Sequence, residues 1–132
     1  MPYVAIVTAV ALLQFVWFGW QVGAARTKYN VPAPAVSGNE AFERVFRVHM
    51  NTLEQLVVFL PALWIFAYLV SPIWAAALGV VYIIGRAIYA RSYVKDPKGR
   101  TLGFLLSILP AMSLLIGILI WAVMALLKTP AG

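Results

Sequence analysis

Four long stretches of the chain are rich in hydrophobic residues, and short segments with proline, glycine or charge separate them. Each stretch is at least as long as the roughly 20 residues that an α-helix needs to cross a bilayer. Pro32, Pro34 and Gly38 are breakers that mark the first connecting loop. The pattern predicts one integral membrane domain, residues 1–132, with helices at about 3–25, 40–70, 73–93 and 101–127.

The first stretch favours a retained helix over a cleaved signal peptide. Its nearest basic residues, Arg26 and Lys28, follow the apolar run, whereas a signal peptide carries its positive charge before a shorter apolar core. Within the fourth stretch, Pro110 predicts a kink that a membrane helix tolerates.

Composition excludes an ordinary soluble domain. Hydrophobic residues make up 64% of the 132 residues and charged residues only 11%, whereas a soluble domain carries about 25% charged residues. The fold class predicted is therefore an all-α membrane protein, a bundle of four transmembrane helices. Cysteine is absent, which excludes disulfides, thiolate metal sites and a protein thiol nucleophile. Any thiol chemistry must therefore use the thiol of a ligand.

The positive charges, which give a net charge of +6, are unevenly placed. Most of them lie in or beside the loops that follow the first and third helices, which share one face of the bundle: Arg26, Lys28, Arg44, Arg47, Arg91, Lys95, Lys98 and Arg100. Only Lys128 belongs to the opposite face. The positive-inside rule makes loops 26–39 and 91–100 cytoplasmic and puts both termini on the other side. The compact loops favour a bacterial inner membrane over the endoplasmic reticulum, and gathered cations can also bind an anionic ligand.

Two helices carry a polar face inside otherwise apolar sequence. The second helix repeats polar residues at spacings of four, four and three, and the third at four, three and four: Glu43, Arg47, Asn51 and Glu54, then Tyr82, Arg86, Tyr89 and Tyr93. Polar side chains within a membrane must be satisfied by protein or water, so we expect the two faces to meet. One alternative is an internal network in which Arg47 neutralises Glu54 or Glu43 and no ligand binds.

Other residues allow simpler interpretations. Tyr93 alone is typical of an interfacial anchor, whereas Tyr89 lies one turn deeper beside Arg86, where a phenol could donate to an anion. His49 lies off the polar face and has no second histidine to help it, which favours a packing residue over a metal ligand. We expect no metal site. The tryptophans are expected to face lipid or to lie at the membrane interface: Trp17, Trp20, Trp64, Trp74 and Trp121.

The segment FERVFRVHMNTLEQ, residues 42–55, resembles the signature of the membrane-associated proteins in eicosanoid and glutathione metabolism, which include microsomal glutathione transferases and leukotriene synthase. The similarity extends to Arg26 at the end of the first helix, to the proline-rich loop before Gly38, to VYIIGRAIYARSY at 81–93 and to Arg100. It covers nearly the whole chain.

The resemblance implies a homotrimer of four-helix subunits that binds glutathione between neighbouring subunits near the cytoplasmic face. The implied glutathione-binding residues are Arg47, Asn51, Glu54, Tyr89 and Tyr93, with Arg26 and His49 reaching in from the adjoining subunit. Arg100 is the implied catalytic residue, which stabilises the thiolate. The implied activity is conjugation of glutathione to a lipophilic electrophile or reduction of a lipid hydroperoxide. The partners are glutathione as co-substrate, the lipophilic substrate and the bilayer, with no nucleic acid.

Three positions depart from the family pattern: Thr27, His49 and Gln55. Thr27 stands where leukotriene synthase has a second arginine, which argues against leukotriene synthesis itself. Two other functions stay open: a non-catalytic lipid-binding or scaffold member of the same family, and a small proton-coupled exporter. The exporter needs a titratable acid within the membrane, for which Glu54 is the candidate.

Overall fold

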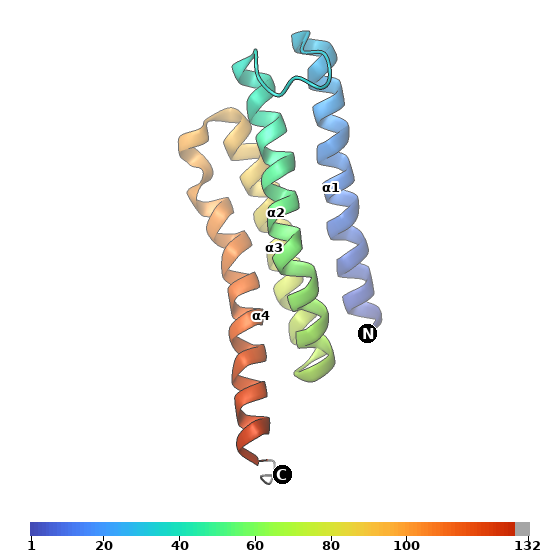
Figure 1. Cartoon of the computed structure of the whole chain (residues 1–132), viewed down its shortest axis with the longest axis vertical. Coiled ribbons are helices and arrows are strands. Elements are labelled where there is room, and N and C mark those ends of the chain that lie inside the picture. Colours follow the sequence, from blue (N-terminus) through green and yellow to red (C-terminus); the bar gives the residue numbers. More distant parts are fainter. Residues whose placement is uncertain (129–132) are drawn as a thin grey trace.

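The computed structural model describes residues 1–128 as an up-and-down bundle of four long helices (Figure 1). The helices are α1 (Pro2–Tyr29), α2 (Glu40–Leu69), α3 (Pro72–Lys95) and α4 (Thr101–Lys128), and a short 3-10 helix, η1 (Pro97–Arg100), precedes α4. All four long helices are long and apolar enough to cross a membrane. The predicted all-α bundle of four membrane helices is confirmed.

Local capping explains where the middle helices begin. The side chain of Asn39 accepts a hydrogen bond of 3.0 Å from the Phe42 backbone N–H at the start of α2. Ser71 does the same for Trp74 at 3.2 Å at the start of α3, where Pro72 occupies the first turn. Only residues 70 and 71 separate α2 from α3, and this short turn holds the two helices side by side.

The first helix is longer than the sequence predicted. It continues to Tyr29, so the loop expected from residue 26 begins instead at Asn30. Asn30 is left-handed, with φ 56°, and its N–H donates to the Arg26 carbonyl. Basic residues in the last turn, Arg26 and Lys28, complement the negative end of the helix dipole, which favours the extra turn. Similarly, α3 ends at Lys95 rather than at residue 93.

The core lies between the helices, and much of the outer surface is hydrophobic. Phe59 of α2 stacks on Tyr82 of α3 with ring centroids 3.8 Å apart, and Leu63 and Leu114 are fully buried beside them. All five tryptophans are exposed, from 39% for Trp64 to 73% for Trp20. Large apolar side chains over the outer faces are typical of a bundle in lipid.

Two glycines bring α3 and α4 unusually close. A Cβ atom built on Gly85 of α3 would lie 2.6 Å from the carbonyl carbon of Leu106, and one built on Gly103 of α4 would overlap the backbone of Tyr89. Small residues allow membrane helices to approach in this way. The contact at Gly103 holds the first turn of α4, and with it Arg100, beside the tyrosines of α3.

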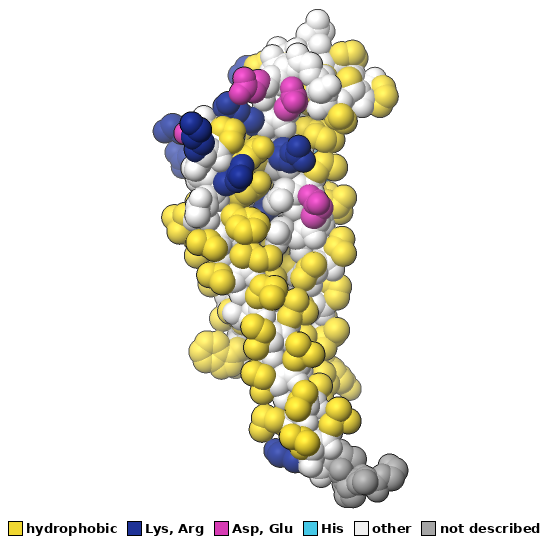
Figure 2. Space-filling view, turned by 60° about the vertical axis from the view of Figure 1, so that its left-hand side comes forward, with side chains coloured by type: hydrophobic (Ala, Val, Ile, Leu, Met, Phe, Trp, Pro, Cys, Tyr) yellow, Lys and Arg dark blue, Asp and Glu magenta, His cyan; other side chains and the backbone are white. Residues whose placement is uncertain are grey.

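The two cationic loops share one end of the bundle. The α1–α2 loop and the α3–α4 connection lie together at the top in Figure 1, whereas the N-terminus and the α2–α3 turn lie lower. Figure 2 shows Lys and Arg side chains gathered at this loop-bearing end above a mainly hydrophobic surface. We call this end of the bundle the cationic end. An anionic ligand that approaches it would meet concentrated positive charge.

Candidate functional site

A cavity of about 340 Å³ opens at the cationic end among α2, α3, η1 and α4. Its lining, which defines the site cavity, is Arg47, Asn51, Tyr89, Tyr93, Arg100 and Phe104. Five of these six residues are among the eight predicted as site residues. The polar faces of the second and third helices therefore meet, as the sequence predicted.

The α2 wall of the site cavity supplies a cation and an amide one turn apart. Arg47 is exposed, and within residues 1–128 no ion pair joins it to Glu43 or Glu54. The ion pair found in this part of the chain joins Arg44 to Glu40, at 3.0 Å. The internal network considered from the sequence is thus not formed, and the Arg47 guanidinium is available to a ligand.

Asn51 carries an unmet hydrogen-bonding capacity. Its Oδ1 is buried and accepts no hydrogen bond from any described residue. Buried side-chain oxygens are nearly always paired, with protein or with ordered water. An N–H or O–H donor of a bound molecule in the site cavity would satisfy this oxygen.

The α3 wall is a stacked pair of phenols above a buried cation. The Tyr89 and Tyr93 rings lie nearly parallel, with centroids 5.5 Å apart, and Tyr89 is buried. Beneath them the Arg86 guanidinium lies 4.3 Å from the centre of the Tyr89 ring. Arg86 is fully buried and donates a 2.8 Å hydrogen bond to the hydroxyl of Thr52 on α2.

Arg100 reaches the site cavity from the last residue of η1. Asp96 caps this short helix by accepting a 3.1 Å hydrogen bond from the Lys98 N–H, and Pro97 fixes its first turn. Arg100 is exposed, and its guanidinium makes no hydrogen bond or ion pair with any residue in 1–128. Two unpaired guanidiniums and no carboxylate line the cavity, so its chemistry suits an anion.

Three predicted site residues do not line the site cavity. Arg26 fastens the α1–α2 loop, since its Nη1 donates to the Ala35 carbonyl at 2.7 Å, and its guanidinium lies 4.9 Å from the centre of the Phe42 ring. His49 stacks on Phe15 of α1 with ring centroids 4.5 Å apart. This contact agrees with the interpretation of His49 as a packing residue.

The third, Glu54, is exposed on α2 and does not line the site cavity. The expectation that it faces protein is wrong for the described chain, where Glu54 is exposed. A helix turns about 100° per residue, so Glu54 is rotated by about 60° from Asn51, enough to take it past the edge of the cavity.

Sequence reasoning missed two contributors to the site. Phe104 lines the site cavity, and its position in the first turn of α4, four residues after Arg100, is the signal that could have found it. Thr52 holds Arg86, but a threonine next to Asn51, outside the repeating polar face, carries no signal of this role. A neighbouring cavity of about 410 Å³ shares Arg47 and Tyr93 with the site cavity and contains Glu43.

Comparison with known proteins identifies relatives along most of the chain. Residues 4–120 match the MAPEG family. An uncharacterised protein of Synechocystis sp. is 47% identical over 116 residues, which cover 88% of this chain and 85% of that protein. Human microsomal glutathione S-transferase 2 is 41% identical over 104 residues, 79% of this chain and 71% of its own length. Mouse leukotriene C4 synthase is 35% identical over 96 residues, 73% of this chain and 64% of its own length.

The family match and the four spanning helices agree with each other. The matched range begins within α1 and ends within α4, so it contains every residue of the site cavity. The chain is an integral membrane protein with four candidate spans, and it belongs to the MAPEG family.

Proposed function

We propose that this protein is a membrane-embedded glutathione transferase that activates glutathione as a thiolate. The thiolate attacks lipophilic electrophiles, and the same site reduces lipid hydroperoxides. The names of two relatives, a microsomal glutathione S-transferase and a leukotriene C4 synthase, support glutathione as co-substrate and a lipophilic second substrate. The observation that carries the proposal is the site cavity itself, where the unpaired guanidiniums of Arg47 and Arg100 stand without any lining carboxylate.

The residue types of the site cavity match the groups of glutathione, which has two carboxylates, one ammonium, two amides and a thiol. Arg47 presents a planar fork that can bind a carboxylate through two hydrogen bonds. Asn51 Oδ1 accepts from an amide N–H of the tripeptide, which would end its unpaired state. The hydroxyls of Tyr89 and Tyr93 donate to carboxylate or amide oxygens.

Arg100 has the role of stabilising the thiolate. A free thiol has a pKa of about 8.5 and is mostly protonated at neutral pH. A guanidinium beside the sulfur favours the charged form and so lowers the pKa of the bound thiol. The proton leaves to water at the open mouth of the cavity.

The two reactions balance without any further cofactor. In conjugation, the thiolate forms a carbon–sulfur bond with the electrophile, and a leaving group departs with its electron pair or an activated double bond takes up a proton. In reduction, two glutathione molecules are oxidised to the disulfide, while one hydroperoxide becomes an alcohol and water. The lipophilic substrate reaches the site from the bilayer.

A homotrimer would complete the site. Glu54 is exposed in one subunit, although it lies among the apolar residues Leu53, Leu56 and Val57 of a membrane helix. A carboxylate directed at lipid is costly, so a neighbouring copy that covers Glu54 would remove that cost. Glu54 would then bind the ammonium of glutathione, and Arg26 and His49 would reach the tripeptide from the adjoining subunit.

We further propose that the cationic end lies in the cytoplasm of a bacterial cell, with the protein in the inner membrane and its termini on the other side. The concentration of Lys and Arg beside the two loops supports this orientation. Glutathione then enters from the cytoplasm, whereas the second substrate is dissolved in the membrane.

A conjugation assay on the detergent-purified protein tests the proposal. With glutathione and chlorodinitrobenzene we expect saturable turnover that Arg100→Ala reduces at least tenfold. Lys98→Gln is the matched control, since it removes a neighbouring cation that does not line the site cavity, and it should keep wild-type turnover. Folded protein that neither binds glutathione nor turns over would instead be a lipid-binding or scaffold member of the family.

A further inference from the structure

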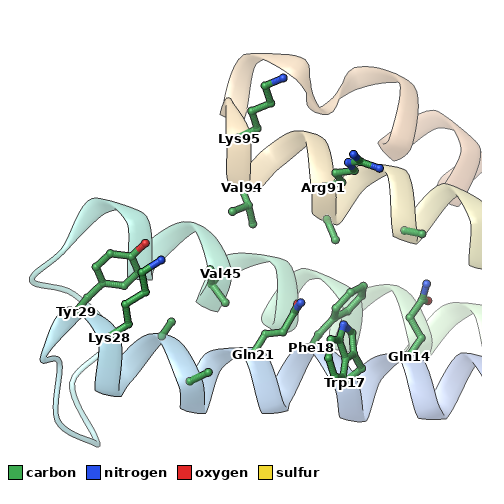
Figure 3. A pocket seen from close by; sticks show the side chains of 14 residues that line it. Gln14, Trp17, Phe18, Gln21, Lys28, Tyr29, Val45, Arg91, Val94 and Lys95 are labelled. Carbon is green, nitrogen blue, oxygen red and sulfur yellow. The ribbon is translucent and has the colours of Figure 1, made fainter.

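A third and larger cavity lies between α1 and α3, away from the site cavity. Its volume is about 670 Å³, and none of its lining residues lines the site cavity. Figure 3 shows Trp17, Phe18 and Gln21 along α1, with Val94 of α3 opposite and Val45 of α2 between. We call this cavity the α1–α3 groove.

The walls of the groove are apolar over most of their length. Trp17, which is 56% exposed, lines it from α1, and the small side chains of Ala87 and Ala90 line it from α3. Small residues opposite an aromatic ring leave open apolar space between the two helices. At the far end, Gln14 donates a 3.0 Å hydrogen bond to the Ile83 carbonyl and ties α1 to α3.

The other end of the groove carries three cations. Lys28 of α1 and Arg91 and Lys95 of α3 all belong to its lining, which contains no acidic residue. Within residues 1–128 none of the three forms an ion pair. Uncompensated positive charge at the mouth of an apolar channel is complementary to an amphiphile with an anionic headgroup.

The length of the groove matches one leaflet of a bilayer. Lys28 and Gln14 are 14 residues apart on α1. At 1.5 Å per residue this is about 21 Å, whereas half of the hydrocarbon core is about 15 Å. A headgroup at Lys28 therefore leaves room for an acyl chain to reach the middle of the membrane.

We propose that the α1–α3 groove binds one anionic phospholipid of the leaflet at the cationic end. Its phosphate lies among Lys28, Arg91 and Lys95, and one acyl chain runs past Trp17 toward Gln14. A second copy of this chain is a poorer occupant, because the whole chain has four acidic residues against ten basic ones and cannot supply the missing negative charge. This lipid site does not depend on the proposed enzymatic activity.

Native mass spectrometry of the detergent-solubilised protein tests the site. With dioleoyl phosphatidylglycerol and dioleoyl phosphatidylcholine at equal concentration, we expect the phosphatidylglycerol adduct to dominate at one lipid per subunit. One cation near a membrane surface contributes about 1 kcal/mol, so Lys95→Gln should weaken phosphatidylglycerol binding about fivefold. Lys98→Gln removes the same charge three residues away, outside the groove lining, and should change phosphatidylglycerol binding little.

Equal retention of the two lipids would overturn the proposal, because the headgroup charge would then not be recognised. Equal loss of phosphatidylglycerol binding in Lys95→Gln and Lys98→Gln would also overturn it, in favour of a general attraction to charge. Retention of oleate without phosphatidylglycerol would also overturn it, in favour of a fatty-acid site. Cross-links between groove-lining residues of two copies of the chain, in protein that retains no lipid, would identify the groove as a subunit interface instead.

Trp17 provides an independent measurement. Phosphatidylglycerol with brominated acyl chains should quench its fluorescence at lower lipid concentration than brominated phosphatidylcholine does. The difference should disappear in Trp17→Phe and persist in Trp121→Phe, whose ring lies on α4, outside the groove lining. Quenching that is unchanged in Trp17→Phe would contradict an acyl chain in the groove.

Discussion

The guanidinium of Arg86 lies 4.3 Å from the centre of the Tyr89 ring and supports that ring from inside the bundle. Arg86 is fully buried, and its Nε and Nη1 have no hydrogen-bond partner in the described chain. Its one hydrogen bond, to the Thr52 hydroxyl, ties α3 to α2 directly beneath the site cavity. The position of Tyr89 therefore depends on a buried cation that Thr52 helps to hold.

Thr52→Val should destabilise the bundle by about 1–3 kcal/mol, because it removes the acceptor of a buried charged donor. In an Arg86→Met background the same change should cost much less, since no guanidinium is left unpaired. Unfolding by denaturing detergent, measured for the two single variants and the double variant, gives the coupling energy. Additivity within about 0.5 kcal/mol would show that Thr52 and Arg86 act independently.

Gly103→Ala should destabilise the contact between α3 and α4 by about 1–3 kcal/mol, because the added methyl overlaps the backbone of Tyr89. It should also weaken glutathione binding, since Tyr89 and Arg100 would move apart. Gly23→Ala is the matched control, as a Cβ there meets nothing within 4 Å. Thermal unfolding of both variants checks this, and equal stabilities would mean that the close approach at Gly103 is not needed.

Arg47→Ala should weaken glutathione binding by about 10- to 100-fold, the loss expected when a charged hydrogen bond worth about 1.5–3 kcal/mol is removed. The fold should survive, because Arg47 is exposed and makes no ion pair in the described chain. Calorimetric titration with glutathione measures the effect, with Lys98→Gln as control. Unchanged affinity would remove Arg47 from the binding site.

Co-expression of two defective chains tests whether subunits share the site. If Arg26 acts across the interface, Arg26→Ala and Arg100→Ala chains should each be inactive alone but recover activity when mixed. Some sites in a mixed oligomer would then combine an intact Arg100 with an intact Arg26 from the neighbouring chain. Absence of recovery, in mixed oligomers verified by two affinity tags, would contradict the shared site.

The number of helices and much of the site could be predicted because both follow from local patterns. The lengths of the apolar stretches predict the four spans. A spacing of four residues puts Arg47 beside Asn51 on one helix face, and Tyr89 beside Tyr93 on another. The tryptophans are exposed as expected, since large aromatic residues within apolar stretches suit a lipid surface or the membrane interface.

The remaining features depend on tertiary packing that no local pattern carries. The exposure of Glu54 depends on the rotation of α2 within the bundle, and the link from Thr52 to Arg86 depends on how α2 and α3 align. The close approach at Gly103 is likewise visible only once α3 and α4 are packed. The α1–α3 groove joins residues more than sixty positions apart in sequence, such as Gln21 and Val94.

Ultraviolet difference absorption during a glutathione titration tests the central claim most directly, because the thiolate absorbs where the thiol does not. At neutral pH we predict a saturable thiolate signal in the wild-type protein. Arg100→Ala should lose most of this signal while it still binds glutathione, since a shift of one pKa unit changes the thiolate-to-thiol ratio tenfold. A folded wild-type protein that binds glutathione without forming thiolate, or an Arg100→Ala variant with an undiminished signal, would contradict the account.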